Sequence, residues 1–313
     1  RTGPAGLEDV RHVLGGGPVA MEMMTGRHEI ATAIEARLVA APGIFGGWAD
    51  DAGPAIRLES VHHLDKRVNG APLRRAAWYF DVRAQGDAIA DIPTHLVDHV
   101  QRLAPGEALA LVSARRWPTV VPREVFARIT GVSEFPSSLS GSVEDGALAY
   151  LGCGELEFRA GRVPVRCRVR WDLTEPPGGG DSSLVLLRGR RADVRVEQSA
   201  RTGWARRLSV EPRGGEGPAV EAALGAAVAS WQGEWPGLAV APRDGALDIA
   251  IPAALRTPHE TQFARVMDDF VGLVDAAEPP SRRAAETLAK YELLARAMSA
   301  CRTERGAPAL AAD

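Results

Sequence analysis

Apolar and polar residues alternate along the middle of the chain. Between residues 147 and 210 they fall in short runs such as Val163-Pro164-Val165-Arg166-Cys167-Arg168-Val169. This period of two is typical of antiparallel strands that bury one face and expose the other. Other strands are predicted over residues 18–24, 56–68, 78–82, 108–114 and 247–251.

Helical spacing appears on both sides of this central region. Ile30, Ile34 and Leu38 form an apolar stripe within residues 28–39. Residues 86–103 are also helical in pattern, but Pro93 interrupts them, so the helix either begins near Pro93 or bends there. Strands in the middle with helices at the edges predict an α+β fold. The remaining helices are expected over residues 7–14, 123–129, 220–231, 259–274 and 282–301.

The first residues predict a helix, a stop and a strand. Gly15-Gly16-Gly17 follows the helix at 7–14 and precedes the apolar run 18–24. A phosphate-binding glycine loop must instead follow a strand and open a helix. The three glycines are therefore interpreted as the end of a helix, and the segment as the end of an α/β unit.

The composition of the chain argues against nucleic acid and membranes as partners. The chain has 313 residues, 45% of them hydrophobic, with 37 basic and 40 acidic residues. Such a balance gives no basic field for nucleic acid, and no apolar run approaches the length of a membrane helix. Cys153, Cys167 and Cys301 lack the spacing of a disulfide framework or a zinc site, which favours a reducing cytoplasm. Lys66 and Lys290 are the only lysines.

Asp91 and His95 are the first candidate for chemistry. They stand four residues apart at or near the start of a helix, a spacing that places two side chains on one face. A carboxylate beside an imidazole raises the basicity of the ring, which then accepts a hydroxyl proton near neutral pH. The alternative is structural: Asp91 caps the helix and His95 packs beneath the sheet.

Three other groups of residues are ambiguous. Adjacent His62 and His63 point to opposite faces of a strand, so they are not expected to line one site together. His95 and His99 have metal-ligand spacing, but the motif His-Glu-x-x-His is absent, and no metal is predicted. Guanidinium and indole groups lie at a strand end in the run Ser113-Ala114-Arg115-Arg116-Trp117-Pro118-Thr119. These groups either bind a carboxylate or a sugar face, or they form a solvated strand end with a packed tryptophan.

Several longer runs resemble a known family. They include Met23-Met24-Thr25-Gly26-Arg27-His28-Glu29-Ile30, Glu59-Ser60-Val61-His62-His63, Arg75-Ala76-Ala77-Trp78-Tyr79-Phe80-Asp81-Val82, Asp91-Ile92-Pro93-Thr94-His95-Leu96-Val97-Asp98, the run 113–119 and Leu288-Ala289-Lys290-Tyr291. Together they resemble the C-terminal domain of the glucose-fructose oxidoreductase and inositol dehydrogenase family, over nearly the whole chain.

The resemblance implies a fold and a reaction. Family members carry a Rossmann domain for NAD or NADP, followed by an open, mainly antiparallel sheet with helices on one face that binds the substrate. Residues 1–24 are then a Rossmann remnant and residues 25–313 the substrate domain. The family's Asp-x-x-x-His pair maps to Asp91 and His95, the expected catalytic residues, with a sugar or polyol as substrate. The expected substrate contacts are Arg27, His63, Arg115, Arg116 and Trp117.

Two departures from the family pattern limit this expectation. The sequence has no Gly-x-Gly-x-x-Gly after a strand, and neither Lys66 nor Lys290 has the Lys-Pro context of the family's catalytic lysine. The chain alone is therefore expected to bind a dinucleotide poorly and to be inactive without a Rossmann half. The second hypothesis is a carbohydrate-binding or dimerising module without catalysis. In both cases a homodimer through the sheet is expected.

Overall fold

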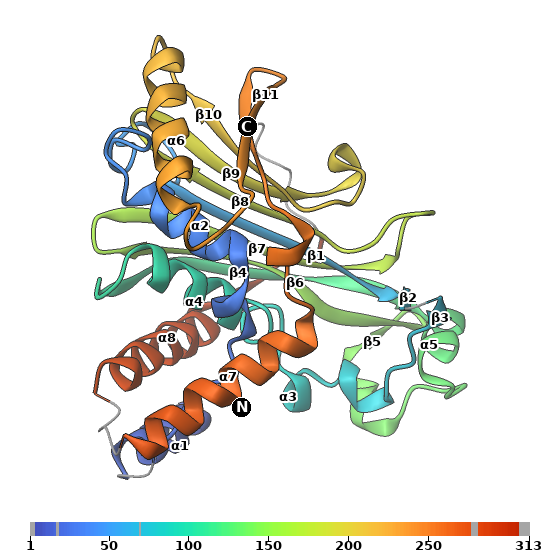
Figure 1. The fold of residues 1–313 in the computed structure, drawn as a ribbon. Coiled ribbons are helices and arrows are strands. Elements are labelled where there is room, and N and C mark those ends of the chain that lie inside the picture. Colours follow the sequence, from blue (N-terminus) through green and yellow to red (C-terminus); the bar gives the residue numbers. More distant parts are fainter. Residues whose placement is uncertain (1–3, 17–18, 69, 277–280, 307–313) are drawn as a thin grey trace.

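A large, mainly antiparallel sheet organises the chain. The computed structural model describes residues 4–16, 19–68, 70–276 and 281–306 (Figure 1). Its sheet has 11 strands in the order β11-β12-β10-β9-β8-β1-β7-β6-β4-β13, with β5 beside β6. The strands are β1 (Ile56–Asp65), β4 (Leu109–Pro122), β5 (Val143–Glu144), β6 (Ala147–Ala160), β7 (Val163–Thr174), β8 (Ser182–Arg188), β9 (Ala192–Gln198), β10 (Arg207–Pro212), β11 (Ala239–Arg243), β12 (Ala246–Ala250) and β13 (Arg302–Thr303).

Two pairs of strands in this sheet are parallel. β1 runs parallel to β7, and β13 runs parallel to β4, whereas the other neighbours are antiparallel. A separate ribbon joins β2 (Arg67–Val68) to β3 (Ala71–Pro72). Because β1 is central and parallel to β7, the end of β1 lies beside the end of β7, with His62 opposite Trp171.

Helices cover one face of the sheet. Figure 1 shows α2, α4, α6 and α8 on the same side, while α1 packs against α8 and α7 against η1. The α-helices are α1 (Pro4–Gly15), α2 (Ile30–Val39), α3 (Val82–Gln85), α4 (Pro93–Leu103), α5 (Arg123–Thr130), α6 (Gly217–Trp231), α7 (His259–Asp275) and α8 (Ser281–Ala300). The 3-10 helices are η1 (Thr25–His28), η2 (Ala77–Phe80), η3 (Ser137–Ser142), η4 (Ala200–Thr202) and η5 (Ala253–Leu255).

The alternation seen in the sequence explains the two faces of the sheet. Along β7, Val165, Cys167 and Val169 are buried beneath the helices, while Arg166 and Arg168 point to the other face. The main core lies between the sheet and helices α2, α4, α6 and α8. The predicted large, mainly antiparallel sheet with helices is thus confirmed. The face without helices, which we call the open face, carries the polar positions.

Three local predictions are wrong. Residues 78–82, expected as a strand, form η2 and the start of α3, because Phe80 packs into a pocket of aromatic rings rather than pairing with a strand. Residues 19–24, the described part of the expected strand 18–24, pair with no strand among the described residues. Residues 113–119 were expected at a strand end but lie within β4, which continues to Pro122.

Candidate functional site at the start of helix α4

Asp91 precedes α4, and His95 lies in the first turn of this helix. The helix begins at Pro93, so Asp91 belongs to the preceding turn and His95 to the helix. The side chain of Asp87 fixes this turn, since its Oδ1 accepts hydrogen bonds from the backbone N–H groups of Ile89 (2.9 Å) and Ala90 (3.3 Å). The sequence therefore places both residues near one helix end.

The two side chains do not bond to each other. Asp91 Oδ1 accepts a hydrogen bond from Gln85 Nε2 (3.4 Å), and no hydrogen bond or ion pair links Asp91 to His95 among the described residues. Because Asp91 precedes the helix, a spacing of four residues does not impose the contact expected within a helix. Their proposed joint role therefore depends on a molecule between them or on a small rotation of either side chain.

Both groups are biased toward their neutral forms. Burial raises the pKa of Asp91, and the positive charges of His62 and Arg75 oppose that shift only in part. His95 is exposed to solvent on the surface, yet partial desolvation of its ring and the charge of Lys290 lower its pKa. A neutral imidazole is the form that accepts a proton.

An aromatic wall stands beside these two residues. The rings of His62 and Trp171 stack with centroids 4.7 Å apart. The guanidinium of Arg75 lies over Trp171, 5.0 Å from the ring centroid, and over Tyr79. Flat aromatic faces and a fixed guanidinium are groups that bind sugar rings and their hydroxyls. We call this set the α4 site: Asp91, His95, His62, Arg75, Tyr79 and Trp171.

Burial determines the ionisation of the tyrosine in this wall. The pKa of Tyr79 is raised to about 12 because its hydroxyl is removed from water. Tyr79 therefore stays protonated at neutral pH and can donate a hydrogen bond. Sequence reasoning missed the roles of Arg75, Tyr79 and Trp171. The only signal was the aromatic run at 78–80, which was interpreted as a strand.

Both adjacent histidines contact one carboxylate, contrary to expectation. His62 Nδ1 lies 3.1 Å from Asp181 Oδ2, and His63 Nδ1 lies 3.3 Å from Asp181 Oδ1. Ser182, the first residue of β8, pairs with Val61, so Asp181 lies just beyond the strand and reaches both faces. Burial alone would raise the pKa of Asp181, but hydrogen bonds from His62 and Lys66 lower it well below its usual range.

A buried ion network lies next to His95. The Nζ of Lys290 lies 2.8 Å from Glu22 Oε2 and 3.3 Å from Asp98 Oδ1. The guanidinium of Arg27 donates to Asp98 through two of its nitrogens, Nε and Nη2, with Nε 3.0 Å from Oδ2. We call these four residues, Glu22, Arg27, Asp98 and Lys290, the buried ion network. Arg27, an expected substrate contact, is thus engaged by Asp98.

The other expected contacts lie apart from one another. Arg115 points to the open face, where its Nη2 lies 2.7 Å from Glu155 Oε1. Its neighbour Arg116 points to the opposite face and pairs with Asp87. Trp117 is buried. Alternate side chains of a strand face opposite ways, so the run 113–119 does not converge on one ligand.

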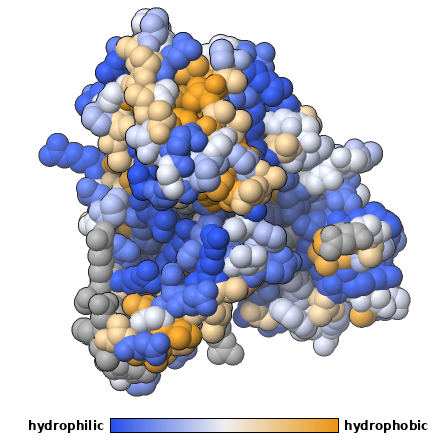
Figure 2. Space-filling view, in the orientation of Figure 1, coloured by the Kyte–Doolittle hydropathy of each residue, from blue (hydrophilic) through white to orange (hydrophobic). Residues whose placement is uncertain are grey.

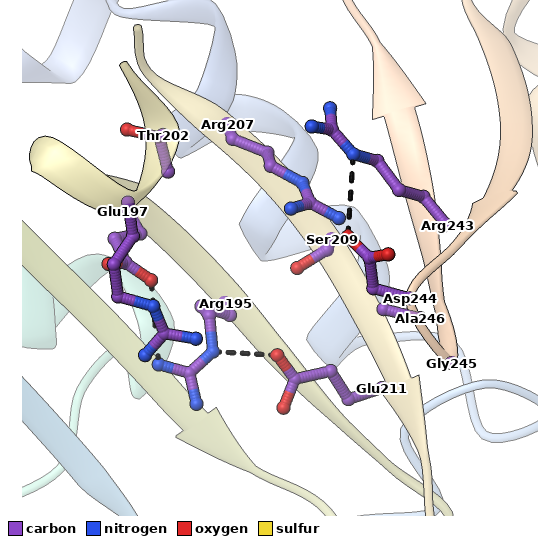
Figure 3. Close-up of a pocket in the computed structure, with 11 residues that line it drawn as sticks. Arg195, Glu197, Thr202, Arg207, Ser209, Glu211, Arg243, Asp244, Gly245 and Ala246 are labelled. Carbon is purple, nitrogen blue, oxygen red and sulfur yellow. Dashed lines mark hydrogen bonds and ion pairs between the residues drawn. The ribbon is translucent and has the colours of Figure 1, made fainter. Parts of the chain in front are cut away.

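Two adjoining cavities lie on the open face. The first has a volume of about 650 Å³ and is lined by residues of β9, η4, β10 and the turn between β11 and β12; Figure 3 shows these side chains. Its charges are paired: Arg195 Nε lies 2.6 Å from Glu211 Oε1, and Arg207 Nε lies 2.7 Å from Asp248 Oδ1. A cavity of about 430 Å³ adjoins it and shares Arg195 and Glu197. Neither contains Asp91 or His95.

The described residues contain neither a metal-binding cluster nor a membrane-spanning helix. No group of three or more His, Cys, Asp or Glu side chains is arranged to hold a metal ion in this part of the chain. Among the described helices, none has both the length and the apolar character needed to span a membrane.

Comparison with known proteins places the chain in a family. A family model described as "Putative oxidoreductase C terminal domain" matches residues 34–302. A crystal structure described as a "putative oxidoreductase" from Parabacteroides merdae is 33% identical, with a TM-score of 0.84, over 88% of this chain and 65% of its own. The chain thus spans about two thirds of the length of that protein. No curated protein matches it.

More distant structures share the fold. KijD10, a 3-ketoreductase from Actinomadura kijaniata solved with NADP and TDP-benzene, is 13% identical, with a TM-score of 0.54, over 98% of this chain and 70% of its own. A structure described as a "putative oxidoreductase" from Thermotoga maritima is 12% identical, with a TM-score of 0.54, over 96% of this chain and 67% of its own.

Proposed function

Because the chain belongs to the family of oxidoreductase C-terminal domains, we propose that it is the substrate domain of a nicotinamide-dependent oxidoreductase. Its substrate is a hydroxyl group of a sugar, a polyol or a related compound. The observation that carries this proposal is the α4 site, in which the exposed ring of His95 has a lowered pKa and lies near an aromatic wall.

His95 is the proposed base. As a C–OH group is oxidised to C=O, the hydroxyl proton passes to the neutral imidazole and hydride leaves the carbon. Asp91, with its raised pKa, is the proposed partner that exchanges a proton with the substrate or with His95. Oxidation of this kind requires a hydride acceptor, NAD or NADP. Of the substrate contacts proposed from sequence, Arg27 and His63 bind carboxylates at or beside the α4 site. Arg115, Arg116 and Trp117 do not converge on it.

The described residues do not fit a dinucleotide. Gly15 ends α1 and Gly16 follows it, so neither glycine follows a strand, and the sequence lacks Gly-x-Gly-x-x-Gly. We therefore propose that a separate dinucleotide-binding domain holds the cofactor and that residues 1–24 belong to that domain. KijD10, which was solved with NADP, supports the choice of a nicotinamide cofactor.

Exposed apolar residues on α7 provide a surface for such a domain. Figure 2 shows apolar surface toward the lower end of the molecule, where α7 lies. Four residues spaced three or four apart form one stripe along α7, and their exposed fractions are 42–51%. An apolar stripe of this kind is usually covered by another protein surface. The residues are Phe263, Met267, Val271 and Val274.

The test of the proposed function is His95→Ala in a protein that joins this chain to its dinucleotide-binding domain. Turnover of NAD(P) with a panel of sugars and polyols should fall about 10²- to 10⁴-fold. His12→Ala, which removes an exposed histidine from α1, is the matched control and should leave turnover unchanged. Thermal unfolding of both variants checks the fold. Near-normal turnover in His95→Ala would refute the assignment of the base.

The charged open face favours a second, non-catalytic candidate function. Both arginines and carboxylates lie on this face, including those around the cavity in Figure 3, so a second copy of the same face can offer each charge an opposite one. We infer that two chains associate through their open faces, either in the enzyme or in a binding module without catalysis. Absence of turnover for all substrates in the joined protein, with sugar binding retained, would favour the module.

A further inference from the structure

Lys290 is a lysine in an unusual position. Its side chain is fully buried, with 0% of its surface exposed, and it bridges Glu22 and Asp98. Lysine is almost never fully buried, and a buried ion pair is often no more stabilising than apolar residues of the same volume. A contribution to stability therefore does not by itself account for a buried lysine at this position, and the groups around its ammonium suggest another role.

The residue of the α4 site on which the charge of Lys290 acts is His95. Asp98 lies three residues after His95 on α4, so the two side chains are neighbours on the helix surface. Two carboxylates, Asp98 and Glu22, favour a charged imidazole, whereas the charge of Lys290 opposes it. The charged groups that act on His95 are Lys290 of α8, Asp98 of α4, Glu22 before η1 and His62 of β1. Asp91 precedes α4, and His99 lies one turn after His95 within α4, where its ring binds Glu35.

Resting on the proposed function, we propose that Lys290 is a positioning residue for His95. Its buried ammonium engages Glu22 and Asp98 and offsets the attraction of these carboxylates for an imidazolium, so the ring stays ready to accept a hydroxyl proton. Arg27 strengthens the effect because its guanidinium occupies the second oxygen of Asp98. The lowered pKa of His95, caused by desolvation and then by Lys290, agrees with this arrangement.

The experiment measures the proton affinity of His95 directly, by NMR titration of the histidine rings of the full chain. The His95 signal is assigned as the one missing in His95→Gln. In Lys290→Met, a neutral side chain of similar length, the proton affinity of His95 should rise tenfold or more because two carboxylates lose their cation. Arg296→Met, which removes an exposed cation from the same helix, is the matched control and should change nothing.

Two further variants keep the test decisive if Lys290→Met does not fold. Glu22→Gln removes one carboxylate and retains the ammonium, so it should lower the proton affinity of His95. Lys290→Arg keeps the charge and should preserve the native titration. An unchanged titration in Lys290→Met, or an increase in Glu22→Gln, would overturn the proposal.

Failure of this proposal is distinguishable from failure of the proposed function. The titration needs neither substrate nor cofactor, so it reports the electrostatic relationship between Lys290 and His95 even in a chain without turnover. Conversely, full turnover in His95→Ala would remove the catalytic role of His95 and leave the titration result intact. In the joined enzyme, Lys290→Met should move the acid limb of the pH profile of kcat/KM to higher pH.

Discussion

Ala88 packs directly over Gly154, so that a Cβ at Gly154 would lie 3.0 Å from the Cβ of Ala88. The backbone N–H of Ala88 also donates to the carbonyl of Leu151 (3.0 Å). These contacts fix the turn before α4 against β6. The position of Asp91 in the α4 site therefore depends on a glycine in the neighbouring strand.

We expect Gly154→Ala to displace this turn. The added methyl group would also meet Ile89 Cδ1 at 3.1 Å and the carbonyl oxygen of Arg115 at 3.3 Å, so a destabilisation of about 1–3 kcal/mol is expected. Urea unfolding measures the stability, and turnover of the joined enzyme should fall as well. Gly225→Ala in α6, where nothing lies within 4 Å, is the control and should be neutral or slightly stabilising. Equal stability of both variants would contradict the close packing.

Arg75 connects the aromatic wall to the end of β1. Its Nε donates to the carbonyl of Leu64 (3.2 Å) and its Nη2 to that of His63 (3.3 Å), while its guanidinium lies 4.5 Å from the ring centroid of Tyr79. Arg75→Lys keeps the charge but loses the planar group that makes both bonds. We expect a loss of about 2 kcal/mol in the free energy of unfolding and weaker sugar binding. Exposed Arg74→Lys is the control, and an equal effect of both would contradict this role.

The sequence predicted the strands and helices of this fold better than the set of side chains in the α4 site. The alternation along β7 and the proline at the start of α4 are local signals, and both specified their elements correctly. Residues 78–80 misled because aromatic residues favour strands, whereas here Phe80 is held by contacts with Phe126 and Tyr150, far away in the chain. Tertiary packing decided that segment.

The buried ion network joins residues that are far apart in the sequence, and local sequence patterns do not predict such contacts. Lys290 and Asp98 are 192 residues apart, and no spacing rule joins them. The same holds for Asp181, which reaches His62 and His63 only because β8 begins beside β1. Asp91 and His95 were accessible to sequence reasoning because four residues separate them, but their surroundings were not.

The raised pKa of Asp91 makes stability depend on pH. In the folded state the carboxyl keeps its proton above the ordinary value of 3.8, because burial disfavours the charged form. Its protonated form therefore contributes stability that is present below pH 3.8 and lost as the pH rises through the folded pKa. Asp91→Asn removes this titration. We expect the variant to gain stability relative to the native chain as the pH rises from 3 to 7, measured by urea unfolding, while turnover falls.

A control separates this effect from general charge removal. Asp50 is an exposed carboxylate on the loop before β1, and Asp50→Asn should change the pH dependence little. If Asp91→Asn and the native chain lose stability in parallel over the whole range, the carboxyl is not buried as described.

Association through the open face should depend on the charges around the cavity in Figure 3. Arg195→Glu would place a third carboxylate beside Glu197 and Glu211, the two that Arg195 now contacts at 3.9 and 2.6 Å. Like charges brought together at an interface oppose association, so the dimer dissociation constant should rise at least about tenfold. Light scattering after size-exclusion chromatography measures it. Arg37→Glu on the helical side is the matched control, because Arg37 pairs with Glu234 away from the sheet face. A monomeric native chain, or equal weakening by both substitutions, would exclude the open face as the interface.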